Sequence, residues 1–583
     1  MFRYVLKRAP TKWPWAIPIA PALRQSQPWF SSLPYSLRQF GHFTPSINNT
    51  FVDETDDTIY ALSSGAGKAG IAVIRISGPG SLNVYTGLCP TKPPPKPRYA
   101  GVRALLDPAS PDASNANILD SDSLILYFPG PKTVTGEDVL ELHVHGGSAT
   151  VKAVLAAIPK CSTLGKVRYA EPGEFTRRAF LNGRLDLAQV ESLGDTLEAV
   201  TEQQRRVAVQ GNSGVLGKTY ERWREELLLA RGEIEALIDF SEDQHFDESP
   251  TELLTNVRQL VEGILHSINM HKLGSQKSEL LRNGIRIALL GPPNAGKSSL
   301  MNQIVGREAS IVSSEAGTTR DIVEANLDIR GYLCSFADTA GIRTESTRSI
   351  SNPNEDSNPV IGAIEQEGIR RARQKAMDSD IVIVLASVEA VKGGGHRISY
   401  DMETLKLAAA AQQCLVAVNK SDVVQRDTLE LLIQEFKSSA LGSVQGLHGA
   451  EPLTISCKAA ATAAAGLTDL GGVHTLTERL VQSFSELTSL PGDMHHLLGV
   501  TERQNQLLSE CQMHLQGFVN EAQACGAGRE PDVVLAAEHL RLAANRLACI
   551  TGRGDSGDVE EVLGVIFEKY CFFLCNVMKK TID

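Results

Sequence analysis

The segment GPPNAGKSS, from Gly291 to Ser299, constrains the fold of this 583-residue chain more than any other feature. It matches the pattern G-x-x-x-x-G-K-S/T, and it lies between the apolar run IRIALL and the helix-like run SLMNQIV. In a strand, turn and helix of this kind, backbone N–H groups and the helix N-terminus bind phosphates. We therefore expect Lys297 to contact the β- and γ-phosphates of a nucleotide and Ser298 to ligate Mg²⁺.

A second motif, NKSD, specifies the base of that nucleotide. It ends in Asp422, whose two carboxylate oxygens can accept hydrogen bonds from the N1–H and the exocyclic amine of guanine. Adenine lacks this pair of donors, so a site built to accept them selects GTP. The later segment TISCK is typical of the last base-contacting loop, although a turn at a strand end would also fit it. The residues expected to bind GTP are Asn294, Ala295, Gly296, Lys297, Ser298, Ser299, Thr318, Thr319, Asp338, Thr339, Ala340, Gly341, Asn419, Lys420, Asp422, Ser456, Cys457 and Lys458.

Two further segments are typical of the switches of a GTPase, although a plain surface loop is the alternative for the first. SSEAGTTRDIV contains Thr318 and Thr319, of which Thr319 is our choice for the second Mg²⁺ ligand. DTAG begins at Asp338 and is followed by Ile342, where Ras-like proteins have the glutamine that orients the attacking water. An isoleucine cannot orient water, so either hydrolysis is slow or another residue takes that role.

The chain is too long for a single core, and strands alternate with helices only in its middle part, which predicts a doubly wound sheet there. Helical periodicity extends from Asp186 to Phe240, where we expect interruptions at Gly211, Gly214 and Gly217, and it returns after Pro491. The expected parts are a mitochondrial transit peptide (1–52), an N-terminal α+β domain (53–170), the first part of a helical domain (171–283), the nucleotide-binding domain inserted into it (284–486) and the second helical part (487–583).

Charge supports the first of these assignments and limits how RNA could bind. The first fifty residues contain six Lys or Arg and no acid, as in a transit peptide, although a disordered tail is the alternative. Without these six charges the net charge of −11 becomes about −17, so RNA binding requires a local basic face or a partner. We expect no membrane span, and the ten cysteines, which form no CxxC pair, are expected to be mostly reduced and buried.

Taken together, these segments resemble one family, the MnmE/TrmE tRNA-modification GTPases, in their mitochondrial form. The resemblance extends from Thr58 to Cys571. It rests on GIAVIRISGP, TGEDVLELHVHGG, EPGEFTRRAFLNGRLDLAQVE, GPPNAGKSSL, GTTRD, DTAGIR, NKSD and a late ITG. It implies a Ras-like P-loop GTPase domain inserted in a helical domain, behind an N-terminal folate-binding-like domain that forms a homodimer.

The resemblance also implies how the missing glutamine is replaced. Members of the family are K⁺-activated GTPases, and Asn294 matches the position that holds the ion. The water-orienting glutamate of the family corresponds to Glu365 in AIEQEGIRRA, although a solvated helix face is the alternative. Between Ile342 and Glu365 the chain carries about fifteen extra polar residues, which we expect to contribute little fixed geometry.

The N-terminal domain is similar to modules that hold a 5-formyl-tetrahydrofolate-type one-carbon donor. By motif position, the implied folate-binding residues are Arg75, Glu141 and Arg184, with solvated strand and helix faces as the alternative. Strand alternation places Glu141 on the face opposite its apolar neighbours, together with His143 and His145, which we expect to be a satisfied strand pair. The catalytic cysteine of the family corresponds to Cys571, with plain helix packing as the alternative, because the residues after it depart from the family pattern.

The implied function is GTP hydrolysis in tRNA modification in the mitochondrial matrix. An FAD-dependent partner of the MnmG type would act with this chain to place an aminomethyl-type group on C5 of the wobble uridine, position 34. A GTP-controlled ribosome-assembly factor would share the P-loop, DTAG and NKSD, but it would lack the N-terminal module. A scaffold with a vestigial nucleotide site is disfavoured by intact Lys297, Ser298, Asp338 and Asp422.

Overall fold

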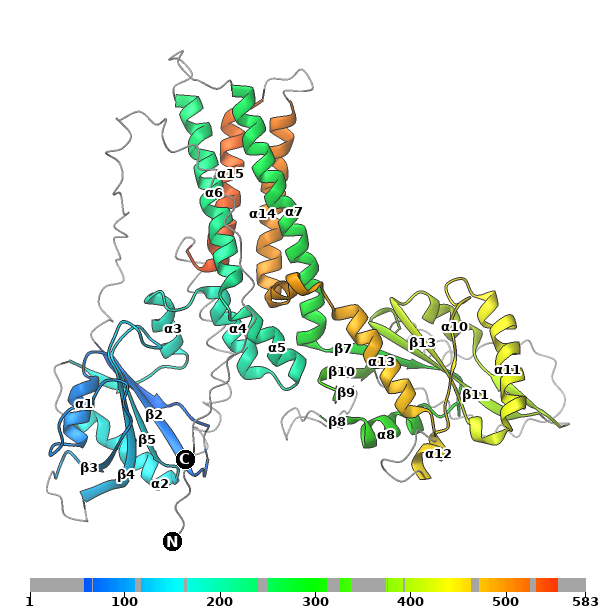
Figure 1. Cartoon of the computed structure of the whole chain (residues 1–583), viewed down its shortest axis with the longest axis horizontal. Helices are drawn as coiled ribbons and strands as arrows, with labels where there is room; N and C mark the ends of the chain where they lie inside the picture. The colour runs from blue at the N-terminus through cyan, green and yellow to red at the C-terminus, as the bar shows by residue number, and fades with distance from the viewer. Residues whose placement is uncertain are drawn as a thin grey trace, which may run out of the picture. The chain divides into compact units, whose positions relative to one another are not determined.

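The computed structural model describes residues 57–553, with gaps at 66, 111–116, 162–164, 240–249, 312–323, 338–373, 375, 392–393, 463–470 and 525–530 (Figure 1). The expected transit peptide over 1–52 therefore lies outside the described residues. Among those described, no helix combines the length and the apolar character needed to cross a membrane. The seven described cysteines are free thiols, and five of them are buried.

The N-terminal part is a sheet of six described strands in the order β3-β4-β5-β2-β1-β6. Its strands are β1 (Thr58–Leu62), β2 (Ile71–Ser77), β3 (Gly101–Leu106), β4 (Ile118–Phe128), β5 (Val139–His145) and β6 (Val167–Tyr169). In β5, Leu140, Leu142 and Val144 are buried, whereas the alternate side chains of Glu141 and His143 are partly exposed. The buried face packs against α1 (Ser81–Leu88) and α2 (Ser148–Ala157), so the α+β expectation is confirmed.

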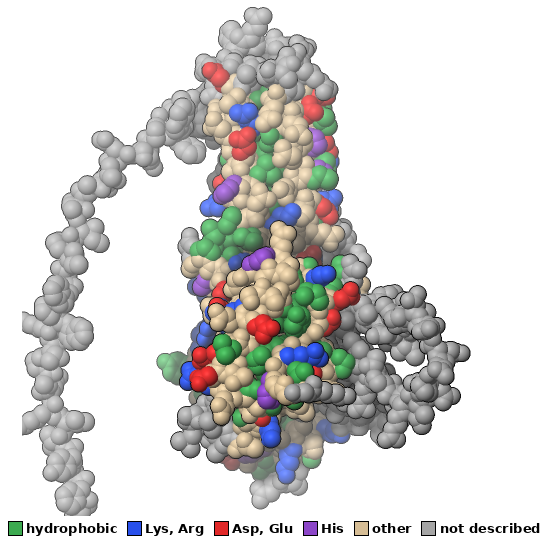
Figure 2. Space-filling view, turned by 90° about the vertical axis from the view of Figure 1, so that its right-hand side faces the viewer, with side chains coloured by type: hydrophobic (Ala, Val, Ile, Leu, Met, Phe, Trp, Pro, Cys, Tyr) green, Lys and Arg blue, Asp and Glu red, His purple; other side chains and the backbone are tan. Residues whose placement is uncertain are grey.

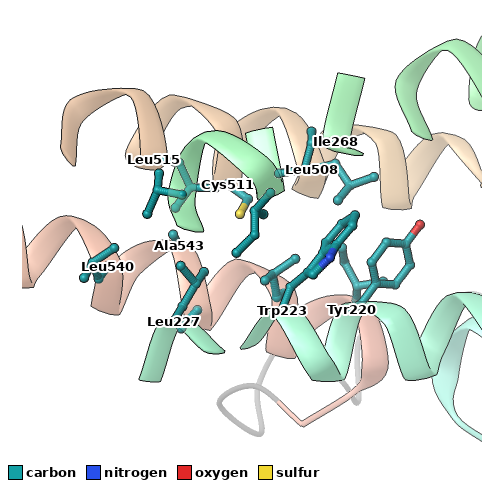
Figure 3. Close-up of a cluster of buried hydrophobic side chains, with 14 of the residues drawn as sticks. Tyr220, Trp223, Leu227, Ile268, Leu508, Cys511, Leu515, Leu540 and Ala543 are labelled. Atoms are coloured by element: carbon teal, nitrogen blue, oxygen red, sulfur yellow. The ribbon is translucent and has the colours of Figure 1, made fainter. Parts of the chain in front are cut away.

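The helical part consists of α4 (Leu187–Glu198), α5 (Glu202–Gly211), α6 (Val215–Asp239), α7 (Pro250–Asn283), the 3₁₀ segment η6 (Gly492–Gly499), α14 (Glu502–Ala524) and α15 (Val533–Thr551). One core joins its two halves. Tyr220, Trp223 and Leu227 of α6 lie with Leu508, Cys511 and Leu515 of α14, Ile268 of α7, and Leu540 and Ala543 of α15 (Figure 3). Because residues on both sides of the nucleotide-binding domain build this core, that domain is an insertion.

The expectation that three glycines interrupt the helices is wrong for one of them. Gly211 ends α5, and Gly214, with a φ of 73°, precedes α6. Gly217 instead lies inside α6, where a Cβ atom would come within 2.1 Å of a carboxylate oxygen of Asp186. Asp186 caps α4 by accepting a hydrogen bond from the Gln189 N–H at 2.8 Å. Gly217 therefore allows the close approach of α4 and α6 and does not break a helix.

The nucleotide-binding part is a sheet of eight described strands, with the path β14-β13-β11-β7-β10-β9-β8 and with β12 beside β11. Its strands are β7 (Ile285–Leu290), β8 (Ala309–Ile311), β9 (Glu324–Ile329), β10 (Tyr332–Ala337), β11 (Ile381–Ala390), β12 (His396–Ser399), β13 (Gln413–Asn419) and β14 (Leu453–Thr454). The pairs from β14 to β10 are parallel, whereas β9, β8 and β12 pair antiparallel. The prediction of a mostly parallel sheet is thus confirmed for its centre.

Helices cover both faces of this sheet, and the apolar run of β7 follows from that arrangement. Ile287 and Leu289 point into a core shared with α8 (Lys297–Arg307), α12 (Cys457–Thr462) and α13 (Val473–Thr488). Ala288 and Leu290 point into a second core, shared with α10 (Met402–Ala409) and α11 (Arg426–Ser439). A strand buried on both faces has no polar alternation, and the phosphate-binding loop follows its carboxyl end.

Candidate functional site: a guanine nucleotide site and a charged pair on the N-terminal sheet

The loop between β7 and α8 has the backbone that a phosphate-binding turn requires. Gly291 and Gly296 have φ values of 148° and 98°, and a Cβ on Gly296 would lie 2.2 Å from the side-chain nitrogen of Asn419. Asn294 also has a positive φ, of 62°, which asparagine tolerates better than most residues. Lys297 donates hydrogen bonds to the carbonyls of Gly291 and Pro292 at 2.7 and 3.0 Å, so its ammonium group lies across the loop.

The electrostatics of this loop suit an anion. Burial lowers the pKa of Lys297 from its ordinary value, because the charged ammonium loses hydration. A phosphate beside the ammonium group would compensate for this lost hydration through its negative charge. Ser298 and Ser299 are exposed in the first turn of α8, where helix N–H groups have no intrahelical acceptor and the helix dipole favours negative charge. Ala295, in the same turn, is buried in the core of the domain.

Asn419 joins this loop to the two base-recognition segments. It ends β13 with 3% of its side chain exposed, and its amide nitrogen donates to the Ala295 carbonyl at 2.8 Å. Its amide oxygen accepts a hydrogen bond from the Cys457 N–H at 3.2 Å. One side chain therefore fixes the phosphate loop and the Ser456–Lys458 loop in a single arrangement. Asn419 was expected in the site from the NKSD motif, but its contact with both loops was not.

The base-recognition side chains are held next to one another. Ser456 donates its hydroxyl to Asp422 Oδ1 at 2.6 Å. Each carboxylate oxygen can accept two hydrogen bonds, so both oxygens of the exposed Asp422 stay available to the two guanine donors. Lys420 adopts a positive φ of 63°, and its ammonium lies 3.8 Å from Glu389. Lys458 is exposed beside them. Strand-end positions on β7, β13 and β14 thus converge at the carboxyl edge of the parallel strands.

Several predicted residues lie outside the described part of the chain. They are Thr318, Thr319, Asp338, Thr339, Ala340, Gly341, Glu365 and Cys571. Strand β10 ends at Ala337, the residue before the DTAG motif, and Ala337 pairs with Ala288 of β7. The roles of these eight residues remain predictions.

A second cluster lies on the partly exposed face of the N-terminal sheet. Arg75 of β2 and Glu141 of β5 are directly opposite in register, and the guanidinium contacts one carboxylate oxygen at 2.9 to 3.0 Å. His143 Nε2 lies 3.5 Å from the other carboxylate oxygen of Glu141. His145 is paired with Asp120 at 2.8 Å, so the expectation of a satisfied histidine is confirmed for His145. It is wrong for His143, whose buried Nε2 makes no hydrogen bond to any described residue.

Arg184, the third residue expected at the folate site, has a different contact. Its Nε donates to the Thr133 carbonyl at 2.9 Å, in the loop between β4 and β5. Asn182 donates to the Thr135 carbonyl of the same loop at 2.7 Å. The described structure therefore brings Arg75 and Glu141 together directly and ties Arg184 to the loop that leads into β5.

A buried ion network, which was not expected from the sequence, holds α3 (Glu174–Leu181) to the N-terminal sheet. Arg178, 7% exposed, contacts Glu137 at 3.0 Å and Glu174 at 3.1 Å. Arg168 of β6 makes two bonds of 2.7 and 2.8 Å to Glu174. Burial would raise the pKa of Glu174, but the Arg168 hydrogen bonds, the Glu171 N–H and the nearby Arg178 charge lower it overall. The charge-rich motif EPGEFTRRAF was the available signal.

The parallel sheet, the phosphate loop after β7 and the guanine-recognition side chains define a P-loop GTPase. Within the P-loop GTPases, the chain matches the descriptions of two protein families, which specify its family. Residues 58–184 match the GTP-binding protein TrmE N-terminus, and residues 187–571 match the MnmE helical domain. The chain belongs to the MnmE/TrmE family of tRNA-modification GTPases.

Curated relatives agree over most of the chain. A mitochondrial 5-taurinomethyluridine-(tRNA) synthase subunit GTPB3 of Danio rerio is 37% identical over 88% of this chain and 93% of its own length. The tRNA modification GTPase MnmE of Rhodopseudomonas palustris is 38% identical, with coverage of 88% and 98%. The mitochondrial tRNA modification GTPase MSS1 of Saccharomyces cerevisiae is 33% identical, with coverage of 88% and 92%.

Proposed function

We propose that this protein is a mitochondrial, K⁺-activated GTPase that modifies C5 of the wobble uridine of mitochondrial tRNAs. An FAD-dependent protein of the MnmG type would be its partner, and an aminomethyl-type group would be added at position 34. The observation that carries this proposal is the Asn419-braced guanine site in a chain whose N-terminal sheet also presents the Arg75–Glu141 pair. The curated mitochondrial relatives in Danio rerio and Saccharomyces cerevisiae support the location and the RNA substrate.

In this proposal the described residues bind GTP in a fixed orientation. Asp422 accepts the two guanine donors, while Ser456 holds one of its oxygens and so orients the carboxylate. Lys297 moves its hydrogen bonds from the loop carbonyls to the β- and γ-phosphates. The exposed Ser298 hydroxyl suits Mg²⁺, a cation that prefers oxygen ligands, and Thr319 would provide a second hydroxyl. Mg²⁺ would neutralise charge on the phosphates.

Hydrolysis further requires a positive charge near the developing phosphate charge and an oriented water. Asn294 is exposed on the phosphate loop, and its side-chain carbonyl is a suitable oxygen ligand for K⁺. The ion would supply the charge that an arginine finger provides elsewhere. Glu365 would accept a hydrogen bond from the attacking water and so replace the glutamine that Ile342 cannot mimic.

The N-terminal site would hold the one-carbon donor. The Arg75 guanidinium can bind a glutamyl carboxylate or a pterin edge, and Glu141 can accept from pterin N–H groups. Arg184 would border the same site through its bond to the loop before β5. We further propose that this domain forms the homodimer, and that Cys571 acts as a nucleophile or an acid–base group in the modification.

The second candidate function is that of a GTP-controlled ribosome-assembly factor. It would use the same GTP site as a switch and would make no covalent change to RNA. The N-terminal module and its match to the TrmE N-terminus disfavour this candidate, because such a factor has no need of a one-carbon donor site.

The water-orienting role gives the sharpest test of the hydrolytic mechanism. Glu365→Ala should lower GTP turnover by about 10² to 10³, as the loss of another positioned catalytic group does, while GTP affinity stays near normal. Single-turnover hydrolysis and equilibrium binding of a non-hydrolysable GTP analogue separate the two effects. Glu367→Ala is the matched control, because it removes a carboxylate two residues away. Parent-rate hydrolysis by Glu365→Ala in K⁺ would assign the role to another residue.

A further inference from the structure

The N-terminal sheet is locally basic in a protein that is acidic as a whole. From Thr58 to Leu106 the sequence contains no Asp or Glu, but it contains six Lys or Arg: Lys68, Arg75, Lys92, Lys96, Arg98 and Arg103. Between residues 57 and 185 there are fourteen Lys or Arg and ten Asp or Glu, a net charge of +4, whereas the whole chain carries −11. The electrostatic interaction of a polyanion with this domain is therefore more favourable than with the rest of the chain.

Part of that charge gathers on one exposed loop, Thr91–Ala100, between α1 and β3. Lys92 and Lys96 are exposed there, and Tyr99 is 60% exposed. The Lys96 ammonium lies 4.1 Å from the centroid of the Tyr99 ring. The Tyr99 ring thus stays largely open to solvent, although large aromatic side chains usually gain free energy by burial.

Arg98 fixes this loop against a second one. Its N–H donates to the Tyr127 carbonyl at 2.8 Å, and its guanidinium donates to the Lys132 carbonyl and lies 5.7 Å from the Phe128 ring. The exposed Lys132 is thereby held next to the loop Thr91–Ala100. We name Lys92, Lys96, Tyr99 and Lys132 together the basic loop surface.

The charges of the basic loop surface are not neutralised by nearby acids. Within the described residues, no carboxylate lies at ion-pair distance from Lys92, Lys96 or Lys132. The two acids closest in sequence to Lys132 are engaged elsewhere. Glu137 is bound to Arg178, and Asp138 accepts from the Tyr127 hydroxyl and the Gly130 N–H. By contrast, the face of the molecule drawn in Figure 2 shows Lys and Arg interspersed with Asp and Glu.

We propose that the basic loop surface binds the sugar–phosphate backbone of the tRNA substrate, with Tyr99 as a stacking platform for an unpaired base. This inference rests on the proposed function for the identity of the RNA. Unpaired lysines suit phosphates, and an exposed aromatic ring suits the bases of single-stranded loops and ends. An acidic peptide would use the lysines but would gain less from the ring, whereas an anionic membrane would use both. The tRNA is favoured because the chain belongs to a family of tRNA-modification GTPases, and vesicle binding is measured beside it.

The test measures the affinity of the full-length chain for an unmodified tRNA transcript over a range of salt concentrations. Lys92→Ala/Lys96→Ala/Lys132→Ala should weaken binding roughly tenfold or more and lower the slope of log K against log salt by about 3, near 1 for each lysine. The matched control, Arg397→Ala/Lys406→Ala/Arg426→Ala, removes three exposed charges from the nucleotide-binding domain and should retain the parent affinity. Both variants should keep the parent GTP turnover and melting curve.

Tyr99 provides an independent check of the stacking role. Tyr99→Ala should weaken tRNA binding about 5- to 100-fold, whereas Tyr99→Phe, which keeps the ring, should bind like the parent. Equal losses in both Tyr99 variants would remove stacking from the proposal, and a triple lysine variant with parent affinity and salt slope would overturn it. Loss of binding to cardiolipin-containing vesicles with unchanged tRNA affinity would also overturn it, in favour of a membrane.

Failure of this inference can be told apart from failure of the proposed function. If the lysine variant loses tRNA binding while wobble nucleosides are unchanged in cells that lack the protein, the RNA-binding surface stands and the modification does not. If those nucleosides change but the variant binds tRNA normally, the modification stands and the surface is wrong.

Discussion

At the scale of single residues, Asn419 shows how one buried amide can organise a nucleotide site. Both polar atoms of its side chain are used, one toward the phosphate loop and one toward Cys457. A buried amide left without such partners would cost free energy, so the two loops are fixed by the same requirement that pairs the amide. The described loops of the GTP site are therefore held in one arrangement by the protein itself.

Asn294 provides the test of the proposed K⁺ dependence. Replacing Na⁺ by K⁺ should raise GTP turnover by the parent protein substantially, because a bound cation stabilises transition-state charge. Asn294→Ala should remove the response to K⁺ while GTP binding stays close to that of the parent. Turnover measured in matched NaCl and KCl series gives the answer, and equal parent rates in both salts would refute K⁺ activation.

Arg75 provides the test of the one-carbon site. Arg75→Ala should weaken binding of 5-formyl-tetrahydrofolate roughly tenfold or more, because Glu141 would remain without its cation and the donor would lose a bidentate partner. GTP turnover should not change. Arg103→Ala is the matched control, since Arg103 lies on β3, which β4 and β5 separate from the strand β2 that carries Arg75. Unchanged folate affinity in titration calorimetry would clear Arg75 of the role.

At the scale of elements, ion pairs attach helix α3 to the N-terminal sheet. Its Glu174 and Arg178 connect to β6 and to the loop before β5, although the sequence boundary was expected near residue 170. We propose that the N-terminal domain extends to about residue 185 and that the helical domain begins with α4. Removing one partner of such a buried network leaves an uncompensated charge, which costs about 3 to 5 kcal/mol.

This network should also make the attachment of α3 sensitive to acid. The pKa of Glu174 is lowered from its ordinary 4.5, so its ionised form contributes stability that is full above that value and is lost as the pH falls through the lowered pKa. Hydrogen exchange of α3 amides should show protection that declines on acidification in the parent. Glu174→Gln should have less protection near neutral pH and a weaker dependence on pH.

Arg178→Ala tests the same network from its other side. It should accelerate exchange in α3 at neutral pH, whereas Arg222→Ala, which removes an exposed ion pair of 3.9 Å, should not. Protection in Glu174→Gln that matches the parent at every pH would show that this carboxylate does not hold α3.

Much of this element structure could be predicted because local patterns determine it. The glycine spacing of the phosphate loop, the apolar strands before it and the alternation in β5 each follow from the sequence of a few residues. What could not be predicted depends on partners far apart in the chain. The Arg178–Glu137 bond spans 41 residues, and Gly217 is understood only once Asp186 is known to lie against α6. The sequence alone does not specify which distant residues come into contact in this way.

At the scale of the whole molecule, α4 connects both halves of the helical domain. Its Glu191 binds Arg503 of α14, and Arg503 also donates to the Cys549 and Ile550 carbonyls near the end of α15. Its Asp195 lies 2.8 Å from Arg282, which is in the last turn of α7, three residues before β7 begins. The segments that enter and leave the nucleotide-binding domain are thus joined within one core, as an inserted domain requires.

The central claim, that GTP hydrolysis by this chain serves wobble-uridine modification, is tested most directly by mass spectrometry of nucleosides from mitochondrial tRNA. Cells that lack the protein should lose the C5-modified wobble uridine. The parent gene or Lys406→Ala should restore it, and Lys297→Ala, which lacks the phosphate-binding cation, should not. An unchanged wobble-uridine profile in cells that lack the protein would contradict the account.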